Sequence, residues 1–214
     1  SITDYNASCG TNVVIPETID GYTVTEIADG IWDDNLGKNF SAFANKGITS
    51  VTMPDTIIKI GSMAFIHNNI TDLKLSENLE TINSEAFMGN KLQEVKLPAS
   101  LKYIGQSSFY SNNLTTVDIP ESVTTLGGGA FASNNLKGEN AFIYGRNSNG
   151  TTNYTVLNSY ASKGNLEMSI PSTIKTIAYR CFRGAGITEI DIPSNVEEIG
   201  GNAFTNVGLK KVTL

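Results

Sequence analysis

The side chains that could do chemistry in this chain are few and widely spaced. Two carboxylates, Glu189 and Asp191, lie two residues apart, and Glu167 precedes Glu189 by 22 residues. On neighbouring strands such carboxylates would lie about 5 Å apart, a distance that suits a retaining glycosidase. No set of pocket-forming loops surrounds them, so a solvated acidic face is the better interpretation. We therefore predict that the protein is not an enzyme.

The sequence also lacks the sets of residues that nucleophilic catalysis and metal binding require. The one histidine, His67, takes a turn position, which leaves a Ser or Cys nucleophile without a base. Cys9 and Cys181 fall near opposite ends of the chain, and several intervening repeat units exclude a disulfide between them. The cluster at 33–35, Asp-Asp-Asn, lacks the ligand spacing and the downstream Glu of a calcium loop, so we interpret it as a solvated turn. We predict no metal and no cofactor.

The elements that must position these residues repeat with a fixed period. Four segments align without a gap at a spacing of 22 residues, and two further copies precede the chain end: 48–69, 70–91, 92–113, 114–135, 165–186 and 187–208. A period of this length indicates a solenoid, whose units must stack to bury their apolar faces. We predict a single domain over 1–214. Its parts are an irregular first repeat (1–47), regular repeats (48–135), a divergent coil (136–164) and final repeats (165–214).

Each unit begins with apolar residues at its first, fourth and sixth positions, such as Leu114, Val117 and Ile119. Alternation of the last two with polar residues predicts a short strand with one buried face, and the proline that follows ends it. An aliphatic pair comes next, and then a small residue and phenylalanine, as in Ala130-Phe131. Stacking of the units would place these rings in a buried column.

Asparagine and glycine mark the end of each unit. Side-chain amides at Asn68, Asn90, Asn112 and Asn134 are expected to bond backbone groups of the turn and of the next coil. One position later, residues that tolerate a positive φ predict left-handed turn positions at Gly47, Asn69, Asn113, Asn135, Gly186 and Gly208.

Two segments break the period. The first, 31–41, is an insertion before Ala42-Phe43, although Ile31-Trp32 could fill the same small-plus-aromatic position. The second, 136–164, contains two expected strands, 141–144 and 155–160, joined by a turn at 146–150 that continues the sheet through an aberrant coil. Tyrosine and arginine at such a break favour contacts with a partner. The candidate contact residues here are Tyr144, Arg146, Tyr154 and Tyr160.

The outward residues of the expected strands form a second candidate surface. They alternate in charge in the middle of the solenoid and become acidic towards its end. Such exposed pairs contribute at most about 1 kcal/mol each, and the face is nearly devoid of aromatic residues. The candidate contact residues are Asp72, Lys74, Glu94, Lys96, Thr116, Asp118, Glu189 and Asp191.

Composition limits the partners. The net charge of −6 and the scattered lysines argue against nucleic acid and against an anionic membrane surface. No stretch is long enough for a membrane span, and no signal peptide opens the chain, so we expect no direct insertion into a membrane. The final strand at 212–214 would leave an uncapped end. We therefore expect either a longer natural protein or end-to-end self-association through this repeat.

The string Leu-x-x-Val-x-Ile-Pro-x-x-Val-x-x-Leu-Gly-x-x-Ala-Phe at 114–131 recurs with conservative exchanges at 187–204. It resembles the BspA-type (Treponema-type) leucine-rich repeat. The resemblance covers most of the chain. It implies a leucine-rich-repeat solenoid with a parallel β-sheet on the concave face, turns and short extended or 3-10 segments on the other side, and little α-helix.

The resemblance also implies a bacterial protein that is secreted or anchored at the cell surface, and adhesion has been proposed for some members. The leading hypothesis is an extracellular interaction or adhesion module that binds a host protein or a glycan. The alternative is a structural spacer or stalk domain of a larger surface protein, with no ligand of its own. Fold alone does not decide between them.

Overall fold

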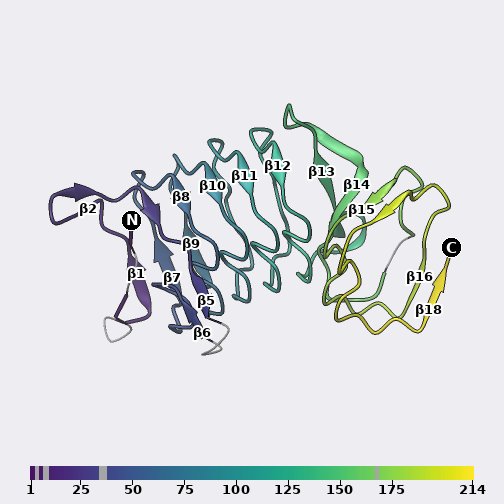
Figure 1. Cartoon of the computed structure of the whole chain (residues 1–214), viewed down its shortest axis with the longest axis horizontal. Helices are drawn as coiled ribbons and strands as arrows, with labels where there is room; N and C mark the ends of the chain where they lie inside the picture. The colour runs from purple at the N-terminus through teal and green to yellow at the C-terminus, as the bar shows by residue number, and fades with distance from the viewer. Residues whose placement is uncertain (3–4, 7–9, 34–37, 167–168) are drawn as a thin grey trace.

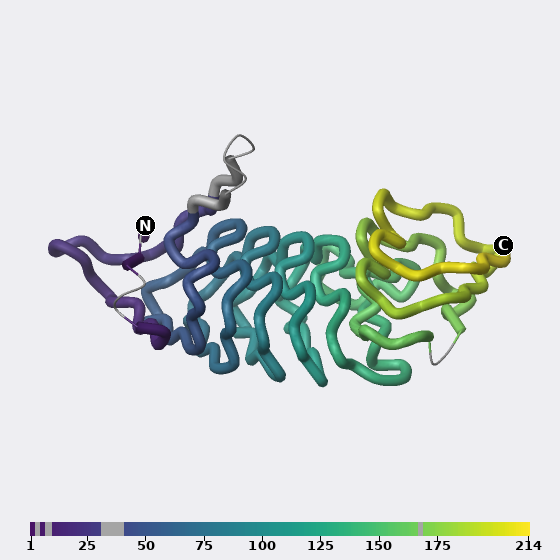
Figure 2. Tube along the Cα trace, turned by 90° about the horizontal axis from the view of Figure 1, so that it is seen from below, coloured from purple at the N-terminus to yellow at the C-terminus, as the bar shows by residue number. Residues whose placement is uncertain are grey.

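The coils of the chain lie side by side in an elongated stack, with the two termini at opposite ends (Figures 1 and 2). This computed structural model describes residues 1–2, 5–6, 10–33, 38–166 and 169–214, with the backbone alone between 31 and 40. Among these residues nearly all regular structure is β, apart from one short 3-10 helix, η2 (Gly138–Ala141). The predicted fold class, a β-dominated leucine-rich-repeat solenoid, is confirmed.

Two parallel sheets run through the regular coils, and the same register recurs along each. The first sheet pairs Asn12 with Ser50 and Ser50 with Asp72. Its strands are β1 (Asn12–Val14), β7 (Ser50–Thr52) and β9 (Asp72–Lys74). The second sheet contains β4 (Glu26–Ile27), β8 (Lys59–Ile60), β10 (Thr81–Ile82), β11 (Tyr103–Ile104) and β12 (Thr125–Leu126).

The divergent segment forms an antiparallel hairpin that rejoins the parallel order, as predicted, with longer strands than expected. In sheet order the strands are β13 (Phe142–Arg146), β14 (Thr152–Tyr160), β15 (Thr176–Ile177) and β17 (Glu198–Ile199). The last coils also pair through β16 (Glu189–Asp191) and β18 (Lys211–Thr213).

Two more hairpins lie near the N-terminus. They are β2 (Thr18–Ile19) with β3 (Tyr22–Thr23), and β5 (Ile31–Asp33) with β6 (Lys38–Phe40). The second is the predicted insertion. Phe43, which follows it, stacks on the next ring and so fills the aromatic position. Asp34 and Asn35 of the suggested calcium cluster lie outside the described residues, as does Cys9.

A column of stacked phenylalanine rings forms the centre of the core, as the repeat predicts. Ring centroids of Phe43, Phe65, Phe87, Phe109 and Phe131 follow one another at 4.8 to 5.4 Å, with interplanar angles of 1° to 14°. The rings are at most 1% exposed. Offset contact of this kind adds to the large apolar area that each ring buries.

Asparagines beside the column tie each coil to the coil before it. Asn90 accepts a hydrogen bond from the Ile70 amide at 3.1 Å and donates to the carbonyl oxygens of Phe65 and Phe87 at 2.9 and 3.0 Å. Asn112 and Asn134 repeat these contacts. The structural role predicted for these asparagines is confirmed, but the neighbour they bond is the preceding coil rather than the next one.

The left-handed positions differ from those predicted, apart from Gly47 (φ 71°). They recur in pairs four residues apart, as at Met63 and His67. Consecutive tight turns bend the chain here, with Ala64 bonding back to Gly61 and Ile66 to Met63. Asn69 instead donates its amide to the preceding coil. The remaining paired positions are Glu85 with Gly89, Ser107 with Ser111, Gly129 with Ser133, Arg180 with Gly184, and Asn202 with Asn206.

The first sheet stops earlier than the repeat predicts. The alternation at Val95 and Leu97, and at Val117 and Ile119, predicts a strand in each of these coils, but neither segment forms a ladder. Where neighbouring coils are hydrogen-bonded along this sheet, the residue after the strand donates its amide to the next coil. Met53 donates in this way to the Lys74 carbonyl oxygen at 3.0 Å. The equivalent amides of Leu75 and Leu97 have no backbone acceptor in the stretch 41–166, all of which is described. We call this side, formed by 12–14, 50–52, 72–74, 94–96, 116–118, 189–191 and 211–213, the strand face.

Long basic side chains connect the divergent segment, and the coil that follows it, to coils that precede it. Arg180 Nη1 forms an ion pair with the Glu85 carboxylate at 2.6 Å and also donates to Ser107 Oγ at 3.4 Å. Gly129 lies beside the Arg180 backbone, where a Cβ would come within 2.8 Å of the Arg180 carbonyl oxygen. Lys163 donates to the carbonyl oxygen of Asn112 at 2.6 Å. The divergent coil is therefore fixed by contacts that reach across several units.

Candidate functional site

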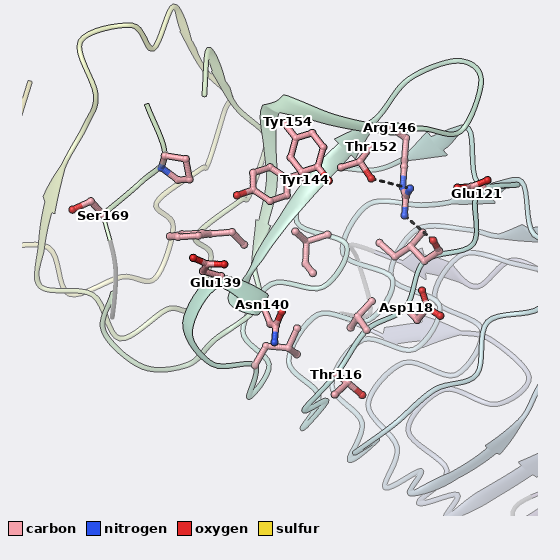
Figure 3. Close-up of a pocket in the computed structure, with 16 residues that line it drawn as sticks. Thr116, Asp118, Glu121, Glu139, Asn140, Tyr144, Arg146, Thr152, Tyr154 and Ser169 are labelled. Atoms are coloured by element: carbon pink, nitrogen blue, oxygen red, sulfur yellow. Dashed lines mark hydrogen bonds between the residues drawn. The ribbon is translucent and has the colours of Figure 1, made fainter. Parts of the chain in front are cut away.

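Three adjoining hollows follow the strand face. The first encloses about 850 Å³ between residues 116–121 and the β13–β14 hairpin (Figure 3). The second, about 500 Å³, lies over 71–73, 94–97 and 116–118 and shares Thr116, Val117 and Asp118 with the first. The third, about 310 Å³, lies by β16 and shares Ser169 with the first. Together they form a continuous candidate surface.

The β13–β14 hairpin supplies one wall of the first hollow. Its turn closes through hydrogen bonds from the Asn147 amide to Thr151 and from the Gly150 amide to Asn147. Gly150 has a φ of 83° and lies against the Glu121 carbonyl oxygen, with which any Cβ would collide. Glycine is therefore required both by the backbone conformation and by the close approach.

Arg146 connects the hairpin to the opposite wall. Its Nη2 donates to the Ile119 carbonyl oxygen at 2.8 Å, and its Nη1 lies 3.4 Å from Thr152 Oγ1 (Figure 3). Nη1 also donates to the Gly150 carbonyl oxygen at 3.1 Å. Burial lowers the pKa of this guanidinium, while the charges of Asp118 and Glu121 oppose that shift. Because both terminal nitrogens of its guanidinium donate to backbone carbonyl oxygens, Arg146 holds the hairpin against residues 116–121.

Two tyrosines form the aromatic part of the hollow. The ring centroids of Tyr144 and Tyr154 lie 5.0 Å apart at an interplanar angle of 58°. Burial, and then the charge of Glu139, raises the pKa of Tyr144. Tyr154 is 61% exposed. An exposed aromatic ring supported by a half-buried one offers a partner a large contact area at little conformational cost.

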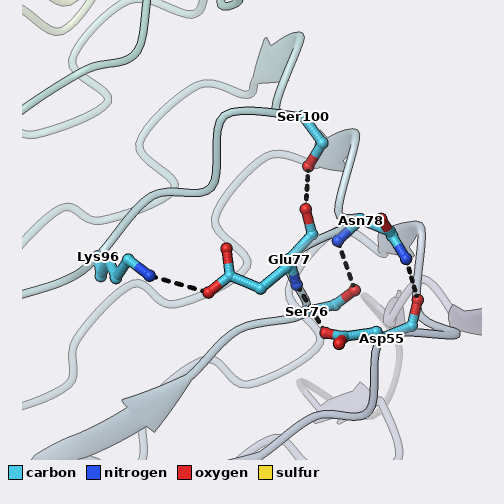
Figure 4. A network of polar contacts seen from close by, with 6 residues as sticks. All are labelled: Asp55, Ser76, Glu77, Asn78, Lys96 and Ser100. Carbon is cyan, nitrogen blue, oxygen red and sulfur yellow. Dashed lines mark hydrogen bonds and ion pairs between the residues drawn. The ribbon is translucent and has the colours of Figure 1, made fainter.

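The second hollow carries unpaired acidic groups. Asp72, Glu94 and Asp118 are exposed, and none forms an ion pair within the stretch 41–166. Of the two lysines in the expected alternation of charge, Lys96 lines the same hollow but turns its amine to Glu77 at 2.9 Å (Figure 4).

Glu77 itself is fixed by its backbone. Its amide donates to the Asp55 carboxylate at 2.9 Å, and its carbonyl oxygen accepts from Ser100 Oγ at 2.8 Å (Figure 4). The Lys96 amine therefore pairs with a carboxylate outside the row of acids. The hollow keeps a negative balance as a result.

Most of the predicted contact residues line these hollows, but not all lie together. Tyr144, Arg146, Tyr154, Thr116 and Asp118 share the first hollow. The second adds Asp72, Glu94 and Lys96, and the third holds Glu189 and Asp191. Lys74 is exposed on β9 but lines none of them. Glu167 lies outside the described residues.

The prediction of Tyr160 as a contact residue is wrong. The side chain is 2% exposed and continues the aromatic column, with its ring 5.5 Å from that of Phe182. Its hydroxyl donates to the Asn165 carbonyl oxygen at 2.7 Å. The sequence contains the signal for this, because Ser159-Tyr160 matches the small-plus-aromatic pattern of Ser108-Phe109.

Sequence reasoning also missed several residues of the first hollow. Glu121, Glu139, Asn140 and Thr152 all line it. Glu121 follows the proline that ends the expected strand, and the other three lie in the aperiodic segment. Their position depends on how the hairpin folds back over 116–121. The repeat pattern of the sequence does not predict that contact.

The described part of the chain shows neither a metal cluster nor a membrane-spanning helix. No group of three or more His, Cys, Asp or Glu side chains is arranged to hold a metal ion there. Nor does any described helix combine the length and apolarity needed to cross a bilayer.

Comparison with known proteins identifies the repeat. The family model described as BspA type Leucine rich repeat region matches in six copies, over residues 39–146 and 155–214. No curated protein matches.

Solved structures show the same fold. A leucine-rich repeat protein from Eubacterium ventriosum is 22% identical, with a TM-score of 0.65 over 97% of this chain and 61% of that chain. The pneumococcal vaccine antigen PcpA is 22% identical, with a TM-score of 0.55 over 99% and 62%. The leucine-rich repeat protein of T. pallidum is 26% identical, with a TM-score of 0.53 over 90% and 70%. This chain thus spans about three fifths of the length of the first two.

Proposed function

Given that this chain belongs to the family of BspA-type leucine-rich repeat proteins, we propose that it is a non-enzymatic interaction module that binds an extracellular protein or glycan through the hollows of the strand face. The observation that carries the proposal is the first hollow. There Tyr144 and Tyr154 share a recess of about 850 Å³ with Glu139 and Asp118. Exposed aromatic rings beside polar groups are typical of binding surfaces.

We further propose that the module acts outside a bacterial cell, secreted or anchored at the surface. One similar fold belongs to a protein named as a vaccine antigen of pneumococcus. Such a location would give an elongated solenoid access to host proteins and glycans.

The proposal is tested by binding of the purified chain to a panel of immobilised extracellular-matrix proteins, mucins and glycans. Tyr154→Ala should weaken binding about tenfold or more, the effect expected of a central aromatic contact. Tyr22→Ala is the matched control, because Tyr22 is 79% exposed on β3, away from the hollows. Equal affinity of both variants and the unmodified chain would remove this hollow from consideration.

The second candidate is a structural spacer that holds another domain away from the cell. It is favoured by the continuous column of rings and the asparagine ladder, which bind successive coils into an elongated stack (Figure 1). A module of this kind needs no ligand. Absence of binding across the whole panel would favour the spacer over the interaction module.

A further inference from the structure

Near both ends of the strand face, neighbouring coils are joined by backbone hydrogen bonds after their strands. In its middle such bonds are missing within 41–166, and we call this the open part. Ile15 and Met53 donate to the next coil at 2.9 and 3.0 Å, and Ile192 does the same near the C-terminus at 2.9 Å. Leu75 and Leu97, at the equivalent position of their coils, have no such bond within 41–166. The second hollow lies over this open part. Backbone groups at the edge of an interrupted sheet can pair with an added strand.

Apolar side chains are also uncovered in the open part. The middle residues of β1, β7 and β16, whose strands pair with the following coil, are buried, with Val13 4%, Val51 1% and Ile190 3% exposed. Leu73, Val95 and Val117 hold the same position in the open part and are only partly buried. All three line the second hollow. An added strand that presents apolar side chains inward would cover them and gain the corresponding transfer free energy.

The negative charge on the open part favours basic residues among the outward side chains of such a strand. Asp72, Glu94 and Asp118 line the hollow without an ion-pair partner in the described stretch 41–166, and Glu121 and Glu139 extend the row. A basic strand would gain from these carboxylates, whereas a neutral glycan would not and an anionic one would be repelled. Tyr154 at the end of the row can receive a cation over its ring.

We propose that the open part of the strand face binds an extended polypeptide segment whose side chains alternate between apolar and basic. The segment accepts a backbone hydrogen bond from the Leu75 amide, places apolar side chains against Leu73 and Val95, and places lysine or arginine opposite Asp72 and Glu94. This inference rests on the proposed function and specifies its partner class.

The test uses the whole chain and a fluorescent peptide, Lys-Val-Lys-Val-Lys-Val-Lys, blocked at both ends. Two further peptides serve as controls. One has glutamate in place of lysine. The other keeps every side chain but is N-methylated on alternate amides along one edge, which removes strand pairing. The expected result is saturable binding of the first peptide, none of the acidic one, and binding of the N-methylated one that is about tenfold weaker.

Two chain variants locate the contact. Asp72→Asn with Glu94→Gln should weaken binding about fivefold, because two exposed ion pairs are lost, and should reduce its salt dependence. Glu17→Gln with Glu198→Gln changes the net charge equally but lies outside the hollows, and should bind as the unmodified chain does. Circular dichroism establishes that both variants are folded.

The outcomes separate this inference from the proposed function. Equal binding of the N-methylated peptide would show general electrostatic attraction and overturn strand addition. Equal weakening in both chain variants would overturn the location. If the peptides fail to bind while a glycan or a folded protein of the panel binds through Tyr154, the inference is wrong and the proposed function stands. If nothing in either assay binds, both are wrong.

Discussion

Replacement of Asn90 by alanine should destabilise the solenoid far more than a typical surface substitution. Asn90 is 2% exposed and makes three hydrogen bonds to backbone groups of two coils. The Ile70 amide would lose its partner, which costs about 1–3 kcal/mol for a buried donor. The carbonyl oxygens of Phe65 and Phe87 would keep Asn68 and Asn112 as donors, so each adds only about 0.5 kcal/mol. The expected loss is about 2–4 kcal/mol.

Asn69→Ala is the matched control. Asn69 follows Asn68, the residue that corresponds to Asn90 in the preceding repeat; it is exposed, and it contributes its backbone amide rather than its side chain to the contacts between coils. Its replacement should change stability by no more than about 0.5 kcal/mol. Urea unfolding followed by circular dichroism gives both values, and an unchanged slope would show that the same unit unfolds. Similar midpoints for the two variants would refute the role assigned to the asparagine ladder.

Three other perturbations give distinct results. Gly129→Ala should destabilise by roughly 1 kcal/mol or more, because φ is 67° and its Cβ would come within 2.8 Å of a carbonyl oxygen of the coil beside it. Gly47 has a similar φ, but a Cβ there would meet no other atom, so Gly47→Ala reports backbone strain alone. Thermal melting of both variants should therefore show a larger loss of stability for Gly129→Ala, and equal losses would exclude a contribution from the collision. In a Cys9→Ser variant, Cys181 should resist a thiol reagent until the chain unfolds, because it is fully buried and burial raises the pKa of its thiol; fast labelling of the native chain would contradict this. Burial and a nearby carboxylate raise the pKa of Tyr144 above its usual 10, so the neutral phenol stabilises the fold below about pH 10, and this contribution is lost as the pH rises through the folded value. Absorbance titration of the unmodified chain against Tyr144→Phe should show one tyrosine that ionises late, and an ordinary curve would contradict it.

The core could be predicted from the sequence because its signals are local and repeated. The ring column needs nothing more than a small residue and an aromatic at the same place in every unit. The asparagine ladder needs one amide beside each ring. Even Tyr160 carries that signal in Ser159-Tyr160, although its place in a divergent segment suggested a surface role.

The left-handed positions show the limit of a local signal. Asn69 and Asn113 tolerate a positive φ, but the turns place it at Met63 and His67 instead. Tight turns four residues apart set these angles, and no turn-favouring residue at Met63 announces them. The residue type shows which positions tolerate a positive φ, whereas the path of the folded chain determines which positions adopt it.

The sequence by itself determined the solenoid, its register and its core, because the same apolar spacing recurs in each coil and stacking is the one arrangement that buries it. Only the tertiary structure decided which coils pair on the strand face, where Met53 bonds to the next coil and Leu75 does not. It also decided that the hairpin carrying Tyr144 folds over Asp118 to form the first hollow. Both depend on distances between coils, which have no counterpart in the period.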